Sequence, residues 1–318
     1  MTQLINFLYA SIKAGTPLLF GTTGEILTEK SGNTNLGVEG MMYMGAIASF
    51  YVGYVYDNFW FSILSAVIAG AFGALIYAFI TVTLKANQTV TGLALTIFGT
   101  GFANFFGEVL TNTVPSGSPK LSEGFMSNLV ALNLFGLADI PIVGRLLFNH
   151  NILVYFGIVI AVVLGVYLKY TRIGLNVRSV GENPGAADAA GINVTLIKYI
   201  NILIGGGVCG LGGAYIALVN GGGVWNNGCV NGQGWIAVAL VIFASWSPFK
   251  ALLGSLIFGA STVLQFYVPR DIINLPNAFY MMLPFIITSA VLIVTSMKKS
   301  KEGAQPASCG TNYFREER

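Results

Sequence analysis

The sequence predicts an all-α integral membrane protein, a polytopic bundle of about eight to ten transmembrane helices with some of them discontinuous. Hydrophobic residues make up 54% of the 318 residues and charged residues only 9%, against about 25% charged residues in soluble domains. Charges are also missing over long intervals. Asp57 is the only charged side chain between residues 40 and 84, and none lies between residues 199 and 249. Because a charge at the bilayer centre costs about 3 kcal/mol, these intervals indicate hydrocarbon.

Nine apolar stretches separated by polar breaks are the candidate spans. In chain order they are residues 4–27, 36–56, 59–84, 90–110, 152–168, 196–219, 235–246, 251–268 and 278–297. The stretch 235–246 is short for a crossing of about 20 residues. It either extends back through Asn231 or is a half-helix. Glycines gather within spans, as at residues 205–213, where small side chains let membrane helices approach closely.

Two clusters of basic residues flank the last four spans. Their members are Lys169, Arg172, Arg178 and Lys198 in the first, and Lys298, Lys299 and Lys301 in the second. Because four crossings, an even number, separate the two clusters, both clusters lie on the same side of the membrane. Loops rich in lysine and arginine usually face the cytoplasm, so we expect this side to be cytoplasmic. We therefore expect residues 1–297 to form the transmembrane domain and residues 298–318 a short, mobile cytoplasmic tail. Residues 111–149 lie outside, either as a surface helix or as a hidden crossing.

Polar residues beside the spans are candidates for a solute path. They are Asn35, Glu39, Asn87, Gln88, Thr89, Gln233 and Trp235. A carboxylate such as Glu39, directly before an apolar helix, is costly unless it faces protein or a hydrated path. It can also cap its helix, whose N-terminus is positive. Likewise, residues 87–89 either line a route for a polar solute or cap the next helix. Trp235 either anchors the chain at the interface or stacks on a solute.

Residues 171–198 contain a short alanine-rich segment in a loop on the basic side. Asn183-Pro184 starts it sharply and Gly191 ends it. A short exposed helix has no core of its own to join, so it is either an ordinary loop helix or built to dock against another protein.

Several chemistries have no signature in the sequence. There is no GxxxxGK[ST] phosphate loop, nucleophile elbow or HExxH motif, and His150 is the only histidine. The three cysteines lack metal-ligand spacing. We expect no metal, no cofactor and no enzymatic activity in this chain, and its net charge of +3 does not indicate nucleic-acid binding.

Three passages resemble the permease subunits of ABC importers for branched-chain amino acids, simple sugars and nucleosides. They are GEILTEKSGNTNLGVEGMMYMGA, ANQTVTGLALTIFG and TRIGLNVRSVGENPGAADAAGINVTLIKY, and the likeness covers residues 17–280. It is closest to the shorter permease of bacterial nucleoside importers.

The resemblance implies a multi-pass permease of the bacterial inner membrane, with its C-terminus in the cytoplasm. It would carry a small polar solute, a nucleoside or alternatively a sugar, by alternating access. Implied partners are separate ATPase subunits that hold ATP and Mg, a second homologous permease and an extracytoplasmic solute-binding lipoprotein. The coupling helix would contain Gly181, Glu182, Asn183, Pro184, Ala187, Asp188 and Gly191. An alternative from another class is a self-contained, ion-coupled secondary transporter.

Overall fold

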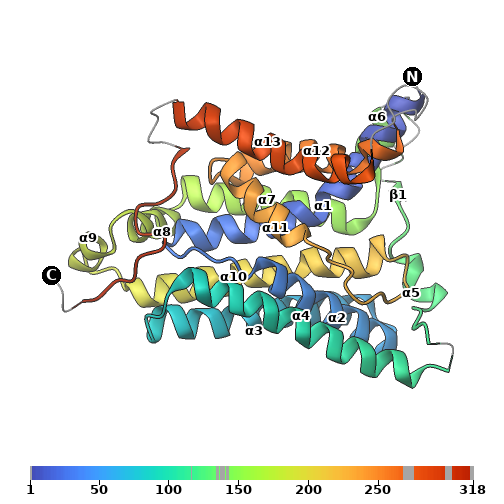
Figure 1. Cartoon of the computed structure of the whole chain (residues 1–318), viewed down its shortest axis with the longest axis horizontal. Helices are drawn as coiled ribbons and strands as arrows, with labels where there is room; N and C mark the ends of the chain where they lie inside the picture. The colour runs from blue at the N-terminus through green and yellow to red at the C-terminus, as the bar shows by residue number, and fades with distance from the viewer. Residues whose placement is uncertain are drawn as a thin grey trace.

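The computed structural model describes residues 2–115, 117–133, 136, 140, 143–267, 276–297 and 303–315. Its long helices run roughly along one direction (Figure 1). The short helices α8 (Arg172–Glu182) and α9 (Pro184–Ala189) lie at one end of the bundle, which we call the α9 end. The short helices α5 (Glu123–Ser127) and α6 (Val143–Leu147) lie at the opposite end, the α5 end.

Each of the nine predicted spans coincides with a helix, of which α11 (Gln233–Phe243) is the shortest with 11 residues. These are α1 (Thr2–Lys30), α2 (Val38–Tyr56), α3 (Phe59–Ala78), α4 (Gln88–Thr113), α7 (Ile152–Tyr170), α10 (Val194–Tyr215), α11 (Gln233–Phe243), α12 (Pro248–Val263) and α13 (Asn277–Met297). The π-turns η1 (Phe79–Thr83) and η3 (Ile216–Asn220) extend α3 and α10, and the 3₁₀ turn η4 (Leu264–Phe266) extends α12. Within the described part of the chain, five helices are long and apolar enough to cross a membrane: α3, α4, α7, α10 and α12 with their extensions. The predicted multi-pass, all-α fold is confirmed.

The segment 111–149, predicted to lie outside, contains only short elements where the structure describes it. Besides α5 and α6 these are two short strands, β1 (Leu132–Asn133) and β2 (Asn149–His150), which pair antiparallel. Leu132 lies opposite His150, and Asn133 opposite Asn149. No helix long enough to cross a membrane occurs in the described residues of this segment.

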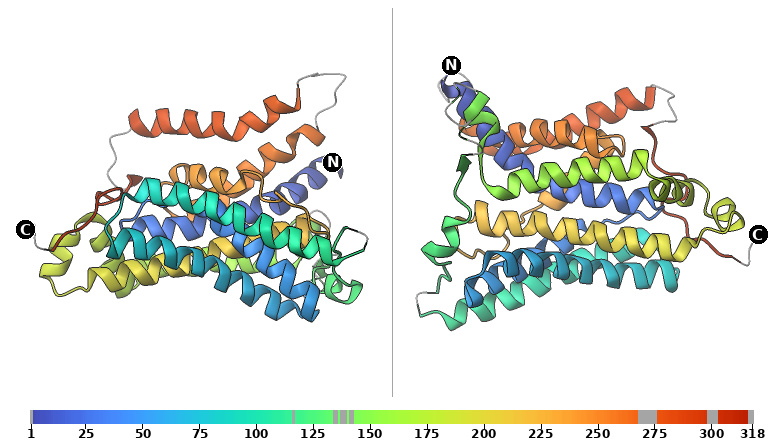
Figure 2. Two further views of the ribbon diagram at one scale, coloured as in Figure 1. Left: turned by 60° about the horizontal axis from the view of Figure 1, so that its bottom comes forward. Right: turned by 180° about the vertical axis from the view of Figure 1, so that it is seen from behind.

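Helix α10 forms the centre of the bundle. Its most apolar stretch is 83% buried, whereas those of α3, α4, α7 and α12 are between 28% and 39% buried. It packs against α1, α2 and α3 (Figure 2). Helix α13 lies at the periphery against α11 and α12. The outer helices expose large apolar side chains such as Ile97 and Ile68, as expected of helices that face lipid.

Glycines bring the backbone of α10 into direct contact with its neighbours. A Cβ added to Gly210 would collide with the carbonyl oxygen of Ala66 in α3, and one added to Gly213 with that of Met42 in α2. A Cβ on Gly205 would lie 2.6 Å from the carbonyl oxygen of Gly24 in α1. The glycines predicted to permit close packing therefore do so at the crossings of the central helix.

Two helices, α2 and α11, begin inside the bundle. Helix α4 starts at the α9 end with Gln88, yet the backbone of Gly40 in α2 packs against Gly99. Gly99 lies eleven residues beyond Gln88, or about 16 Å along α4. Helix α11 starts beside α2, because a Cβ added to Gly234 would lie 2.5 Å from the Cα of Glu39. The predicted discontinuous helices are therefore present.

We expect Gly213→Ala to lower the free energy of unfolding by about 1–3 kcal/mol, because the added methyl group meets the Met42 backbone, which cannot rotate away. Thermal unfolding of the purified protein in detergent measures this. Gly101→Ala is the matched control: an added Cβ there meets no atom, so helix propensity predicts no loss. Equal unfolding temperatures for the two variants would contradict this view of α10.

Candidate functional site

The beginnings of α2 and α11 meet at a carboxylate, and we call this contact the α2–α11 junction. The backbone N–H of Gly232 donates to one oxygen of Glu39 at 2.8 Å, and that of Gly234 donates to the other at 2.6 Å. One turn further along α2, the hydroxyl of Tyr43 accepts from the N–H of Asn231 at 3.2 Å. Glu39 is 5% exposed. Its negative charge lies at the positive N-terminal end of α11, and this arrangement stabilises both the carboxylate and the start of the helix.

The local sequence of the junction suits this close approach. Gly232 has a φ of 83°, a conformation that glycine adopts without strain. Gly234 leaves room for the backbone of Glu39. Of the two alternatives for Glu39, its hydrogen bonds favour capping, although the helix that it caps is α11 and not its own. The two neighbouring candidates, Gln233 and Trp235, are half-buried and 36% exposed respectively.

The linker from α1 to α2, residues 31–37, returns from the α9 end into the bundle. Gly32, with a φ of 87°, ends α1, and the N–H of Asn33 donates back to the carbonyl of Thr28 at 3.4 Å. Asn35 donates its N–H to Glu25 at 3.0 Å and accepts from the N–H of Gly37 at 2.8 Å. The buried backbone of the linker is thus satisfied by polar side chains of the protein.

The three candidates at the start of α4 have different environments. Gln88 is buried, and its side-chain oxygen accepts from the N–H of Thr34 at 2.8 Å. Asn87 is exposed and caps α4 through the N–H of Val90 at 3.0 Å, as one of the two alternatives predicts. Thr89 is exposed. The structure therefore brings Asn35, Glu39, Gln233 and Trp235 to the region of the junction, whereas Asn87 and Thr89 lie at the α9 end of α4.

Two buried side chains that sequence analysis did not single out as path residues have polar atoms without a protein partner. Neither polar atom of the Asn33 amide forms a hydrogen bond within the protein, and the second oxygen of Glu25 accepts none. Buried polar atoms of this kind are expected where a protein interior is hydrated or contacts a polar solute.

The loop predicted to carry a short exposed helix has the expected structure. Asn183 caps α9 through the N–H of Ala186 at 3.0 Å, and Pro184 is its first residue. Gly191, with a φ of 83°, ends it. Ala187 packs inward in a small apolar cluster with Val180 and Val194. Glu182, Asn183, Ala186, Ala189, Ala190 and Gly191 are exposed. The helix thus presents a small-residue surface at the end of the bundle (Figure 1).

The tail is packed against the protein over its described part, residues 303–315, contrary to our expectation of a mobile end. The N–H and hydroxyl of Ser308 both donate to the carbonyl of Gly181, at 2.9 and 2.6 Å. The thiol of Cys309 donates to the carbonyl of Glu29 at 3.2 Å. Burial raises the pKa of this thiol. Residues 298–302 and 316–318 lie outside the described part.

Gln88 connects the tail to the linker. Its side-chain oxygen also accepts from the N–H of Gly310 at 3.0 Å, and its amide nitrogen donates to the carbonyl of Thr311 at 3.1 Å. The tail also reaches α9, since the Tyr313 hydroxyl donates to Asp188 at 2.8 Å. It therefore joins α9, the end of α1 and the start of α4.

Sequence analysis missed the role of Glu29. Its carboxylate accepts a short hydrogen bond from the indole N–H of Trp246, in the turn after α11. This contact ties the end of α11 to the end of α1. The signal in the sequence was an acidic residue one turn after Glu25 in an otherwise apolar helix.

Within the described residues, no group of three or more His, Cys, Asp or Glu side chains is placed to hold a metal ion.

We expect Glu39→Gln to destabilise the protein by about 1–3 kcal/mol, because an amide offers one acceptor oxygen to two N–H groups. Thermal unfolding measures the loss, and solute uptake, the activity that the resemblance to importer permeases implies, is measured in parallel. Glu108→Gln, at an exposed position of α4, is the control. Reduced stability with normal uptake means that Glu39 is a cap alone, whereas unchanged stability would contradict the junction.

We expect Gln88→Ala to release the tail, because it removes hydrogen bonds to Gly310 and Thr311. The measurement is alkylation of Cys309 by a maleimide in a Cys209→Ala, Cys229→Ser background. In the parent the buried, high-pKa thiol should react slowly, and Gln88→Ala should accelerate the reaction about tenfold or more. Thr89→Ala, the exposed neighbour, should react like the parent. Equal rates in all three proteins would mean that Gln88 does not hold the tail.

Comparison with known proteins places these features in a family. The sequence model described as "Branched-chain amino acid transport system / permease component" matches residues 7–292. The protein named nucleoside ABC transporter permease NupC, from Lactococcus lactis, is 32% identical over 94% of both chains. The guanosine ABC transporter permease NupQ of Bacillus subtilis is 32% identical over 92% of both. A Haloferax volcanii protein named "Putative glucose ABC transporter permease protein TsgC13" is 35% identical over 83% of this chain and 78% of its own.

Proposed function

The chain belongs to the family of permease components of branched-chain amino acid transport systems, and from this membership we propose that it is the membrane-spanning subunit of an ATP-driven importer. The match over residues 7–292 is the observation that carries the proposal. ATP and Mg bind to separate ATPase subunits. A second, homologous permease and an extracytoplasmic solute-binding lipoprotein complete the transporter. The ion-coupled alternative would need a carboxylate available to an ion. Glu39 is bound to two backbone N–H groups, whereas one oxygen of Glu25 has no protein partner, so the family match and not the carboxylates favours the importer.

The proposed solute is a nucleoside. This rests on the similarity to NupC and NupQ, which extends over at least 92% of every chain compared. A sugar is the second candidate, supported by the 35% identity to TsgC13 over a shorter part of the chain. The solute would pass near the α2–α11 junction, where Asn35, Gln233 and Trp235 gather around two helix N-termini. The N–H groups at these termini are bound by Glu39 and Asn35, so the solute would contact side chains of the junction.

The α9 end would face the cytoplasm of a bacterial cell and receive the ATPase. Four basic residues of the first cluster, in residues 169–198, lie on the segment that forms this end, which supports the orientation. The exposed face of α9 would sit in a cleft of the ATPase. Glu182 is exposed there and can contact the ATPase, while Ala187 packs inward and holds α9 against the bundle.

A chain of contacts connects α9 to the α2–α11 junction, so a movement of α9 would reach it. Gly181, just before α9, lies so close to the end of α1 that an added Cβ would collide with the Lys30 carbonyl. From there the linker of residues 31–37 leads into α2, whose second residue is Glu39. Closure of the ATPase would therefore displace the end of α1, and the linker would pass this displacement to the start of α2. Alternating access by this route is the proposed mechanism.

The test is purification of the tagged chain from membranes with its partners, together with uptake of labelled guanosine and glucose. We expect an ATPase and a second permease to accompany the chain, and guanosine to be taken up. Ala189→Arg places a large charge on the exposed face of α9. It should release the ATPase and abolish uptake without changing thermal stability.

Thr89→Arg, at an exposed position near the same end, is the control and should keep the ATPase. Recovery of the chain alone, active in uptake without an ATPase, would replace the proposal with a secondary transporter. Uptake of glucose alone would move the substrate to a sugar.

A further inference from the structure

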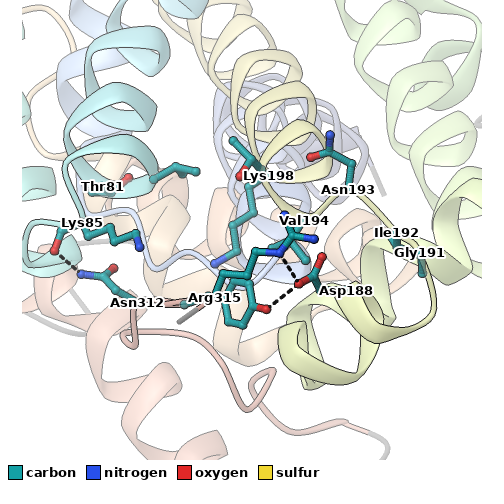
Figure 3. A pocket seen from close by; sticks show the side chains of 13 residues that line it. Thr81, Lys85, Asp188, Gly191, Ile192, Asn193, Val194, Lys198, Asn312 and Arg315 are labelled. Carbon is teal, nitrogen blue, oxygen red and sulfur yellow. Dashed lines mark hydrogen bonds and ion pairs between the residues drawn. The ribbon is translucent and has the colours of Figure 1, made fainter. Parts of the chain in front are cut away.

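A cavity of about 490 Å³ lies at the α9 end, between three parts of the chain (Figure 3). The turn η1 supplies Thr81 and Val82, and Lys85 follows it. The turn from α9 into α10 supplies Asp188 and residues 191–195, and Lys198 follows in the first turns of α10. The tail closes the cavity with Asn312, Tyr313 and Arg315. Nothing in the coupling or transport scheme uses this space.

The charged side chains that line the cavity are three cations and one carboxylate. The carboxylate, Asp188, is already engaged: it accepts from the Tyr313 hydroxyl at 2.8 Å and pairs with Arg315 at 3.2 Å. The ammonium of Lys85 lies 4.3 Å from the centre of the Phe314 ring. The cavity therefore keeps an excess of positive charge after its internal ion pair is formed.

Lys198 is the clearest sign of a missing anion. Its side chain is 4% exposed and points toward the cavity (Figure 3). The hydrogen bond that it donates, to the carbonyl of Gly32, is long at 3.4 Å. Among the described residues, no carboxylate forms an ion pair with Lys198 within 4.0 Å. A buried ammonium without a counter-charge is costly, and buried charges are normally paired.

The start of α10 adds to the positive potential. Val194 and Thr195, in the first turn of this 22-residue helix, line the cavity. The side chain of Asn193 caps the N–H of Leu196 at 3.0 Å, one residue beyond these two. A helix N-terminus beside lysine and arginine side chains is a favourable environment for a polyatomic anion.

We propose that this cavity binds a phosphate-bearing anion, either the headgroup of an anionic lipid or a free phosphorylated solute. Lys198 and Lys85 contact the phosphate oxygens, and Arg315 contacts them from the tail. The first turn of α10 completes the site. The proposal does not depend on the transported solute or on the ATPase, because all of its contacts are within this chain.

Occupancy of the site would act on α9. Arg315 is 78% exposed at its side chain and holds Asp188 through one ion pair. An anion in the cavity competes for Arg315 and at the same time draws the tail toward Lys85 and Lys198. Competition for Arg315 weakens one contact between Asp188 and the tail, so the anion changes how firmly the tail holds α9.

The test is thermal unfolding of the purified full-length chain in nanodiscs of phosphatidylcholine, with sodium pyrophosphate or with sodium chloride at equal ionic strength. At about 100 times its Kd, pyrophosphate should raise the unfolding midpoint by about 4 °C. A parallel series in phosphatidylglycerol-rich discs without pyrophosphate tests the headgroup. A gain with pyrophosphate identifies a free phosphorylated solute as a sufficient ligand. A gain only with phosphatidylglycerol identifies the lipid.

Lys198→Met removes the charge and keeps the length of the side chain. It should unfold at or above the wild-type midpoint in phosphatidylcholine, because an unpaired buried charge is gone, and it should gain nothing from either anion. Lys169→Met, an exposed lysine at the same end and outside the cavity, should respond like the wild type.

Arg315→Gln, which changes an exposed side chain, is the second test variant if Lys198→Met does not fold. It should weaken pyrophosphate binding about tenfold. An equal response of wild type, Lys198→Met and Arg315→Gln to both anions would overturn the proposal. So would the absence of any response in the wild type, or a loss of response in Lys169→Met.

Discussion

The backbone N–H groups at the start of a helix must find acceptors, and inside a membrane no bulk water supplies them. Helices α2 and α11 both begin within the bundle, so acceptors for the first N–H groups of two helices are needed at the α2–α11 junction. Glu39 serves α11 with both oxygens, and the Asn35 side chain receives the N–H of Gly37 just before α2. The same residues fix the distance between the two helices. Without these acceptors neither helix could begin in the middle of the bundle, and the polar junction between them would not exist.

The features that sequence analysis predicted are those with a local physical cause. Long uncharged intervals predict spans because charge is costly in hydrocarbon. The Asn183-Pro184 start and the Gly191 end predict α9 because these residues suit the first and last turns of a helix. Glu39 drew attention because a carboxylate precedes an apolar helix. In each case a few neighbouring residues determine the outcome, so the pattern is visible in one sequence.

The features that it missed depend on contacts between distant segments. The tail binds mainly backbone carbonyls, those of Gly181 and Glu29 among them, and a carbonyl leaves no mark in a sequence. Its charged composition predicts an aqueous location, but composition does not distinguish a free segment from one held by hydrogen bonds. The cavity is a further example, since Lys85, Lys198 and Arg315 are far apart in the chain. Lys198 was assigned to a basic loop cluster, whereas the fold buries it.

The glycine contacts of α10 have a mechanical consequence. Backbone touches backbone where Gly205 meets Gly24, where Gly213 meets Met42 and where Gly210 meets Ala66. Side chains can change rotamer to let two helices slide, but main-chain atoms in contact leave no such freedom. Helices α1, α2 and α3 should therefore resist sliding past α10, as should α4 past α2 at Gly99 and α12 past α1 at Gly259. Any opening of the protein should accordingly occur by hinge rotation rather than by shear between these helices.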